Sequence, residues 1–339
     1  MDTVAFARAR DEISARFGFS AGRDEMSVSA RMLAENATES AELLATALAE
    51  PRFDPDPVER VRGQMLASVA EAKTDPRSVA RRTWYARTFP DHPYGRPTDG
   101  TEAGLTTITR EDLAAAHQRL YTRANAIVAV VGDVGAEEAG ELVDTMLSGL
   151  PEGEPRSAEP VDATPPPGQE VVGLDVPQSV AMLGHTGLPR DDEDFIPAYV
   201  MNHILGGGGF SSRLMTEVRE KRGLAYGVYS YLQPLDGAAL YLSSVQTANA
   251  RMAESLEVIR EQWRRMAEEG TTEDELDKAK KYLTGAFALR FDSNAKIAGY
   301  LVFVKREELG IDYFDRRNDL IEAVTVEDVR SEERRVGKE

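Results

Sequence analysis

The chain has 339 residues, enough for two domains with cores of their own, and its 58 acidic and 40 basic residues give a net charge of −18. A protein this acidic repels phosphate backbones and anionic lipid surfaces, so no nucleic acid partner is expected. The absence of cysteine excludes disulfides, thiolate metal sites and cysteine nucleophiles. No window approaches about 18 uninterrupted apolar residues, so no membrane span is expected, and the first residues lack the basic and apolar regions of an export signal.

The first half of the chain predicts a hairpin followed by helices. Residues 13–21 and 25–33 read as paired strands around a turn at Gly22, Arg23 and Asp24. Helical periodicity then recurs in four stretches, at 40–49, after the Asp and Pro residues of 54–57, at 78–89 and at 110–121. An apolar strand is expected at 126–131.

The second half repeats this order after a segment at 151–168, which is rich in Pro and Glu and is expected to be an extended linker. It opens with two strands and a helix, expected at 170–175, 180–186 and 195–205. A hairpin with strands at 226–233 and 238–246 follows. Helical periodicity then recurs in four stretches, at 250–269, 273–290, 294–308 and 312–323.

Short motifs repeat in register with this order of elements. Thr325, which opens a TVED motif, lies 216 positions after Thr109, which opens TRED, and the SLEV motif at 255 lies 215 positions after SAEL at 40. The two matches favour a duplication with domains at 1–150 and 169–330. The strands and helix that open the second half have no counterpart in the first, so the first domain is expected to be incomplete at its N-terminus. The polar residues 331–339 are expected to be a non-native tail, with a frayed natural terminus as the alternative.

The four histidines form no metal motif in the sequence. His92, His117, His185 and His203 are not spaced as in H-E-x-x-H or H-x-H, so no metal ligand is predicted in this chain. No G-x-S-x-G elbow indicates a serine nucleophile, although the sequence leaves a Ser/His/Asp triad open. The glycine run at 206–209 lacks the GK[ST] ending of a phosphate loop and the strand that precedes one.

The stretch 202–232 is the most informative part of the chain. Its pattern predicts a helix, a glycine loop, a second helix, a glycine stop and a strand. Ser211 or Ser212 is expected to cap the second helix, and Gly223 to end it. Arg219 lies in the last turn of that helix and Tyr226 at the start of the strand, so both side chains are expected to reach one cleft across the corner.

Arg219 and Tyr226 suit the recognition of a peptide amide. Arginine offers a planar fork of donors to carbonyl oxygens, and a tyrosine hydroxyl can donate to a developing oxyanion. Four glycines leave the backbone unshielded, so an extended peptide can approach closely. The substrate-binding residues predicted beside the pair are Gly206, Gly207, Gly208, Gly209, Phe210 and Ser211. The plainer alternatives are an ion pair of Arg219 with Glu217 or Glu220 and simple packing of Tyr226 in its strand.

These residues resemble the pitrilysin/insulinase-type zinc metallopeptidase family, which includes mitochondrial processing peptidase and bacterial two-subunit zinc peptidases. The matching stretches run in order over nearly the whole chain and read HPYGRP at 92–97, YTRAN at 121–125, VVGD at 130–133, and GGFSSRL and REKRGLAY within 206–226. The resemblance implies an α+β fold of two homologous domains, each a mixed or antiparallel sheet backed by helices, that enclose a chamber for unfolded peptides. It also implies that an Arg/Tyr pair, matched here by Arg219 and Tyr226, helps to hold substrate over zinc.

The chain departs from this family at the metal site. Members bind zinc through an inverted H-x-x-E-H motif and a downstream glutamate, and the matching helix here has Ala67 and Ser68 where glutamates stand. Neither side chain can replace a carboxylate ligand. By the duplication, an H-x-x-E-H segment falls before Met1. The resemblance therefore implies that this chain binds no cofactor and that zinc belongs to a homologous partner subunit.

Three functions are compatible with these residues. The first is a non-catalytic, peptide-binding subunit that supplies Arg219 and Tyr226 to a zinc-bearing partner during proteolysis. The second is a self-sufficient zinc endopeptidase whose metal motif lies in a missing N-terminal segment. The third is a structural scaffold that binds no peptide. Bacterial members of this type are often periplasmic, so the resemblance favours that compartment.

Overall fold

Two compact units make up the protein, and each is assembled from separate stretches of the chain. The computed structural model describes residues 1–330. Of the described residues, 1–69, 98–157 and 290–310 form unit 1, and 70–97, 158–289 and 311–330 form unit 2. The units thus differ from the expected domains at 1–150 and 169–330, because two internal stretches belong to the opposite unit. The boundaries of homologous domains stay a prediction, and the expected tail at 331–339 lies outside the described residues.

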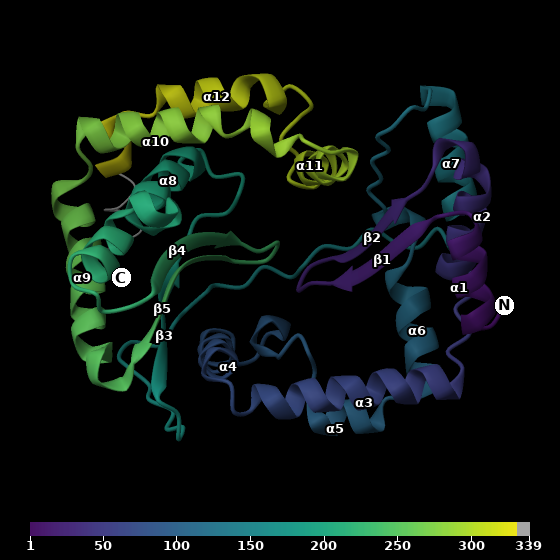
Figure 1. Cartoon of the computed structure of the whole chain (residues 1–339), viewed down its shortest axis with the longest axis horizontal. Coiled ribbons are helices and arrows are strands. Elements are labelled where there is room, and N and C mark those ends of the chain that lie inside the picture. Colours follow the sequence, from purple (N-terminus) through teal and green to yellow (C-terminus); the bar gives the residue numbers. More distant parts are fainter. Residues whose placement is uncertain (331–339) are drawn as a thin grey trace. The chain divides into compact units, whose positions relative to one another are not determined.

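Unit 1 is mainly helical and contains the first predicted hairpin. Strands β1 (Arg16–Ala21) and β2 (Met26–Arg31) pair antiparallel, and the Gly22 N–H donates to the Glu25 carbonyl at 2.7 Å across the turn. This confirms the hairpin expected around residues 22–24. The helices of the unit are α1 (Thr3–Glu12), α2 (Ala37–Ala49), most of α3 (Pro55–Ala72), α5 (Glu102–Thr107), α6 (Arg110–Leu120), α7 (Ala136–Leu147) and α11 (Asn294–Arg306) (Figure 1).

Helices α2 and α7 share the small core of unit 1. Ala37 and Ala41 of α2 cluster with Leu142 of α7, and Leu44 and Leu48 cluster with the nearby Leu150. Helix α1 was not expected from the sequence. It buries none of its residues, so it lacks the apolar stripe that reveals an amphipathic helix.

A three-stranded antiparallel sheet in the order β3, β5, β4 forms the centre of unit 2 (Figure 1). Its strands are β3 (Gln178–Thr186), β4 (Gly227–Pro234) and β5 (Ala239–Ala248), as the second hairpin and the strand at 180–186 predict. The helices of the unit are α4 (Pro76–Thr88), α8 (Phe195–Asn202), α9 (Met252–Glu269), α10 (Glu273–Gly285) and α12 (Tyr313–Ala323).

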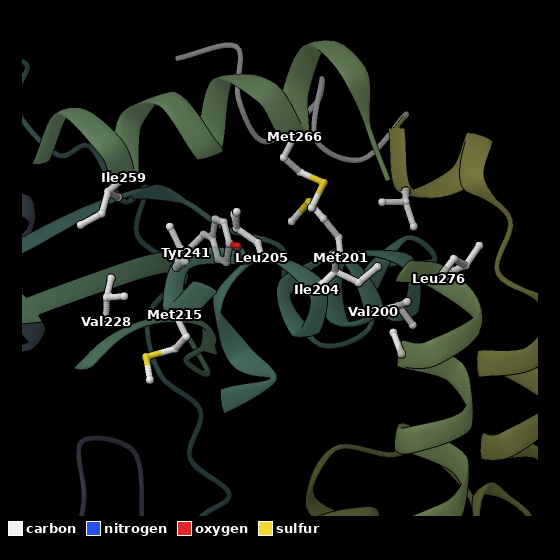
Figure 2. Close-up of a cluster of buried hydrophobic side chains, with 14 of the residues drawn as sticks. Val200, Met201, Ile204, Leu205, Met215, Val228, Tyr241, Ile259, Met266 and Leu276 are labelled. Atoms are coloured by element: carbon white, nitrogen blue, oxygen red, sulfur yellow. The ribbon is translucent and has the colours of Figure 1, made fainter. Parts of the chain in front are cut away.

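Apolar layers cover both faces of this sheet. Tyr241 and Val245 of β5 belong to the large core, which also takes side chains from α8, α9, α10 and α12 (Figure 2). Leu240 and Leu242, on the opposite face of β5, cluster with aromatic side chains of α4. Because successive residues of a strand point to opposite faces, burial on both sides accounts for the four consecutive apolar residues, Ala239–Leu242, that open β5.

Two of the predicted strands are wrong. The apolar stretches at 126–131 and 170–175 form no strand, because no neighbouring strand pairs with them among the described residues. Their side chains are accordingly exposed, Val128 by 46% and Val171 by 78%. The helix expected at 195–205 is α-helical only to Asn202 and continues as a π-helical turn at His203–Gly207.

The repeated Thr-x-x-Asp motif is a helix start in both halves. Thr109 Oγ1 accepts from the Asp112 N–H at 3.1 Å, and the Asp112 carboxylate accepts from the Thr109 N–H at 2.8 Å. Thr325 and Asp328 make the same reciprocal pair at 3.2 and 2.8 Å. Each pair is a capping box, so the match between the halves reflects a shared local structure.

The large core predicts the cost of a cavity in unit 2. Ile259 is fully buried in α9, so Ile259→Ala is expected to lower the free energy of unfolding by about 2–5 kcal/mol. Ile311→Ala is the matched control, since Ile311 is 74% exposed in the same unit and its loss is expected to change stability by less than about 0.5 kcal/mol. Urea titration followed by tryptophan fluorescence measures both, because Trp84 and Trp263 lie in unit 2. Equal effects of the two substitutions would contradict this core.

Candidate functional site

The glycine loop packs directly against the sheet. A Cβ on Gly206 would lie 2.6 Å from the backbone nitrogen of Ser230 in β4, and one on Gly208 would lie 2.6 Å from the carbonyl oxygen of His203. No side chain fits at either position. Gly206 is also buried, whereas Gly207 is exposed. The first glycine therefore seats the loop on the sheet, and the later ones form its accessible part.

Polar side chains tie the floor of the loop to the sheet. The Ser230 hydroxyl donates to Asn202 Oδ1 at 2.7 Å, and the Tyr241 hydroxyl donates to Ser230 Oγ at 3.3 Å. His203 stacks on Tyr282 with ring centroids 5.0 Å apart, and burial lowers the pKa of His203 below its usual value. Asn202 thus ties the start of the glycine loop to β4, and His203 ties it to Tyr282. The sequence alone did not predict this contact of His203.

Two serines fix the far end of the loop. The Ser211 hydroxyl donates to the Gly208 carbonyl at 2.9 Å, and the Ser212 hydroxyl donates to the Gly209 carbonyl at 2.8 Å. Ser212 Oγ also accepts from the Met215 N–H at 3.4 Å, so Ser212 rather than Ser211 caps the second helix. Gly223, at φ +59°, ends this helix as expected, since its N–H donates to the Arg219 carbonyl.

Arg213, near the start of this helix, has a structural role. Its guanidinium donates to both carboxylate oxygens of Glu275 at 2.6 and 2.7 Å and to the Gly270 carbonyl at 2.9 Å. Partial burial of Glu275 would raise its pKa, but the hydrogen bonds from Arg213 and from the Thr272 N–H outweigh burial and lower the pKa to about 2. Arg213 thereby joins the end of α9 to the start of α10.

Arg219 is held in a different way. Its guanidinium carbon lies 4.5 Å from the centroid of the Phe210 ring and 4.9 Å from that of Tyr226. Within residues 1–330, the Arg219 side chain donates no hydrogen bond and has no carboxylate within ion-pair distance. Glu217, one of its possible partners in the sequence, is bound instead by Lys221 at 2.6 Å and by Arg222 at 2.5 Å.

Arg219 and Tyr226 therefore meet across the helix-to-strand corner, as their spacing predicts. Tyr226 is 86% exposed and Phe210 is 64% exposed, so neither ring packs into the core. This excludes simple strand packing as the explanation of Tyr226. The arrangement is a positively charged group beside two exposed aromatic rings, and its N–H donors have no partner among the described residues. Such a group can donate to a carbonyl or carboxylate oxygen.

The comparisons with known proteins agree with this fold. The sequence profile of the peptidase M16 inactive domain matches residues 107–283. The chain belongs to the peptidase M16 family. This confirms the resemblance to pitrilysin/insulinase-type metallopeptidases and the α+β fold class that it implies.

The relatives of this M16 chain include both zinc proteases and a non-peptidase homologue. An uncharacterised zinc protease of Mycobacterium leprae is 31% identical over 334 residues, which cover 96% of this chain and 74% of that protein. A non-peptidase homologue of Helicobacter pylori is 25% identical over 291 residues, covering 86% of this chain and 67% of that protein. The crystal structure of a peptidase M16 inactive domain from Pseudomonas fluorescens superposes with a TM-score of 0.88 at 30% identity, covering 99% of this chain and 81% of that one.

The donor groups of residues 1–330 do not form a zinc site. Ala67 and Ser68 lie exposed on α3, and the described residues contain no group of three or more His, Cys, Asp or Glu placed to hold a metal ion. Three of the histidines bond to backbone atoms. His117 Nε2 lies 2.7 Å from the Leu48 carbonyl, His185 Nδ1 lies 2.7 Å from the Thr186 carbonyl, and His92 Nδ1 accepts from the Tyr94 N–H at 3.2 Å. The fourth, His203, stacks on Tyr282.

None of the helices in the described residues is a candidate membrane span. Each helix there is too short or too polar to span the hydrocarbon core of a bilayer.

The Arg213–Glu275 pair predicts a pH-dependent part of stability. The pKa of Glu275 is lower in the folded protein than in the unfolded chain, so its contribution is complete above about pH 4.5 and is lost as the pH falls toward 2. Glu275→Gln is expected to cost about 1–2 kcal/mol at pH 7 and progressively less below pH 4.5. Urea midpoints at several pH values measure this difference, with Glu268→Gln, an exposed site on α9, as control. A cost that stays constant down to pH 3 would show that the pair does not contribute in this way.

Proposed function

We propose that this chain is the non-catalytic, peptide-binding subunit of a heteromeric zinc metallopeptidase. A homologous subunit supplies the zinc ion and its ligands, and this chain supplies Arg219 and Tyr226. Arg219 binds a carbonyl oxygen of an unfolded peptide, and the Tyr226 hydroxyl donates to the oxyanion that develops at the cleaved amide. The glycine loop at 206–209, Phe210 and Ser211 border the peptide.

The observation that carries this proposal is the state of Arg219. Arginines elsewhere on the surface of this acidic protein pair with carboxylates, as Arg222 does with Glu217. Within the described residues, Arg219 instead makes cation–π contacts with the rings of Phe210 and Tyr226, which leave its N–H groups available. A preorganised donor of this kind is what stabilises charge on a substrate oxygen without further rearrangement. The hydroxyl of Tyr226, the residue directly before β4, adds a second donor.

The assignment of zinc to a partner rests on the donor set of this chain. Ala67 and Ser68 offer no carboxylate, and the histidines make other contacts. The non-peptidase homologue from Helicobacter pylori supports the same view, because its description is that of a family member without peptidase activity. In this chain's own reaction steps, Arg219 orients the peptide and Tyr226 donates a hydrogen bond, while the metal chemistry belongs to the partner.

A second candidate follows from the relatives described as zinc proteases. The Mycobacterium leprae protein is one of these, and the match covers 74% of its length. A self-sufficient peptidase would carry the metal motif in the same polypeptide as Arg219 and Tyr226. Metal analysis of the purified protein separates the two functions, since the self-sufficient enzyme binds one zinc per chain and the proposed subunit binds none.

Substitution of the pair tests the proposed role. The chain is co-expressed with a zinc-bearing homologue from the same cell, and kcat/KM of the purified complex is measured on a fluorogenic peptide. Tyr226→Phe is expected to lower kcat/KM on the order of 100-fold, as for the loss of one oxyanion donor. Arg219→Lys is expected to lower it roughly tenfold, because lysine keeps the charge but loses the planar fork.

Matched controls exclude general damage to the surface. Tyr229→Phe removes a hydroxyl from an exposed tyrosine of β4, and Arg264→Lys changes an exposed arginine of α9. Both are expected to leave kcat/KM unchanged. Co-elution of the two subunits from a sizing column checks that each variant still assembles. Full activity of both Arg219→Lys and Tyr226→Phe in an assembled complex would refute the proposal.

A further inference from the structure

Phe210 is a large aromatic side chain that remains outside the core. It is 64% exposed at the end of the glycine loop, and its contact with Arg219, at 4.5 Å from ring centroid to guanidinium carbon, is the only ring contact recorded for it among the described residues. Its place in the loop predicts contact with substrate. The contact with Arg219 indicates another role.

The backbone around Phe210 is fixed on both sides. Gly209 precedes it at φ +59°, a conformation that suits glycine, and the hydroxyls of Ser211 and Ser212 donate to the carbonyls of Gly208 and Gly209. The loop itself is seated on β4 through Gly206. The backbone position of Phe210 is therefore set by the loop.

The type of contact matters for the chemistry of Arg219. A carboxylate neighbour would occupy N–H donors and neutralise the charge, whereas an aromatic face attracts the cation and takes none of the donors. Tyr226 also contacts the guanidinium, but in the proposed function its hydroxyl has a task of its own. Phe210 has no polar group, so it can hold the guanidinium without competing for the substrate.

We propose that Phe210 is a positioning residue, which acts on peptide binding by holding the guanidinium of Arg219 between the glycine loop and Tyr226. This inference rests on the proposed function of Arg219 and adds to it. A peptide that settles on the glycine loop meets an arginine whose direction the loop has already set. Phe210 acts through Arg219 and makes no essential contact of its own with the peptide.

The strength of an exposed cation–π contact sets the expected effect. Such contacts correspond to about a two- to fivefold change in an equilibrium constant. Phe210→Leu is expected to weaken binding of fluorescein-labelled β-casein, an unfolded polypeptide, by this factor in a fluorescence anisotropy titration of the full chain. Phe210→Trp and Phe210→Tyr keep an aromatic face and are expected to retain binding. Phe19→Leu is the matched control, since Phe19 is 50% exposed in β1 of unit 1.

A double-mutant cycle with Arg219→Gln distinguishes positioning from direct contact. If Phe210 acts through Arg219, Phe210→Leu has no further effect once Arg219 is glutamine. Independent, additive losses would overturn the inference, because Phe210 would then bind the peptide itself. So would unchanged binding by Phe210→Leu alone beside a clear loss with Arg219→Gln. If Arg219→Gln itself binds like the parent protein, the proposed function fails together with the inference, which sets that outcome apart from the other two.

Nuclear magnetic resonance of the free protein gives a readout that does not depend on the peptide. The side-chain protons of Arg219, assigned by their loss in Arg219→Gln, should be shifted upfield by the ring currents of its aromatic neighbours. Phe210→Leu is expected to move them toward the position of a solvent-exposed arginine, and Phe210→Trp to keep the shift. No movement in Phe210→Leu would overturn the positioning role.

Discussion

The close approach of the glycine loop to strand β4 is the constraint on which the site depends. Gly206 lies so near Ser230 that no Cβ fits between them, and the Ser230 hydroxyl is bound to Asn202 at the end of α8. The loop, the helix that follows it and the strand are thereby joined at one point of the sheet. A larger side chain at Gly206 would force them apart and move Phe210 and Arg219 away from Tyr226.

Two arginines six positions apart, Arg213 and Arg219, have different surroundings. Arg213 finds Glu275, whose carboxylate also closes the capping box at the start of α10, and the pair becomes part of the scaffold. Arg219 lies six positions later, where Glu217 is already bound by Lys221 and Arg222. Lys221 and Arg222 thus bind Glu217, and Arg219 contacts the aromatic rings of Phe210 and Tyr226 instead.

The sequence predicts the elements whose signals are local. Both hairpins and the helix stop at Gly223 follow from residues within a few positions of one another. The strands expected at 126–131 and 170–175 fail because a strand needs a neighbour to pair with, and an apolar run does not say whether one is present. Helix α1 escapes prediction for the opposite reason, since it buries no apolar face.

In the candidate site, too, the contacts between residues close in sequence could be predicted and the contacts between distant residues could not. The corner that brings Arg219 to Tyr226 spans only seven positions and can be predicted from the helix stop between them. The partner of Arg213 is 62 positions away, so the sequence could not tell which arginine was bound and which was free. The contact of Phe210 with Arg219 was also hidden, although an aromatic residue directly after a glycine run and nine positions before an arginine on the next helix is a signal worth testing in other sequences.

The surroundings of Arg219 contrast with the acidic composition of the chain. With 58 acidic and 40 basic residues, carboxylates are in excess over this molecule as a whole, yet none lies within ion-pair distance of Arg219 in the described chain. Aromatic contacts supply the stabilisation that a salt bridge would otherwise give, and they do so without filling the donor positions. If Arg219 binds a peptide oxygen as proposed, no protein carboxylate has to be displaced from the guanidinium first. A carboxylate beside Arg219 would compete with the peptide for the same N–H donors.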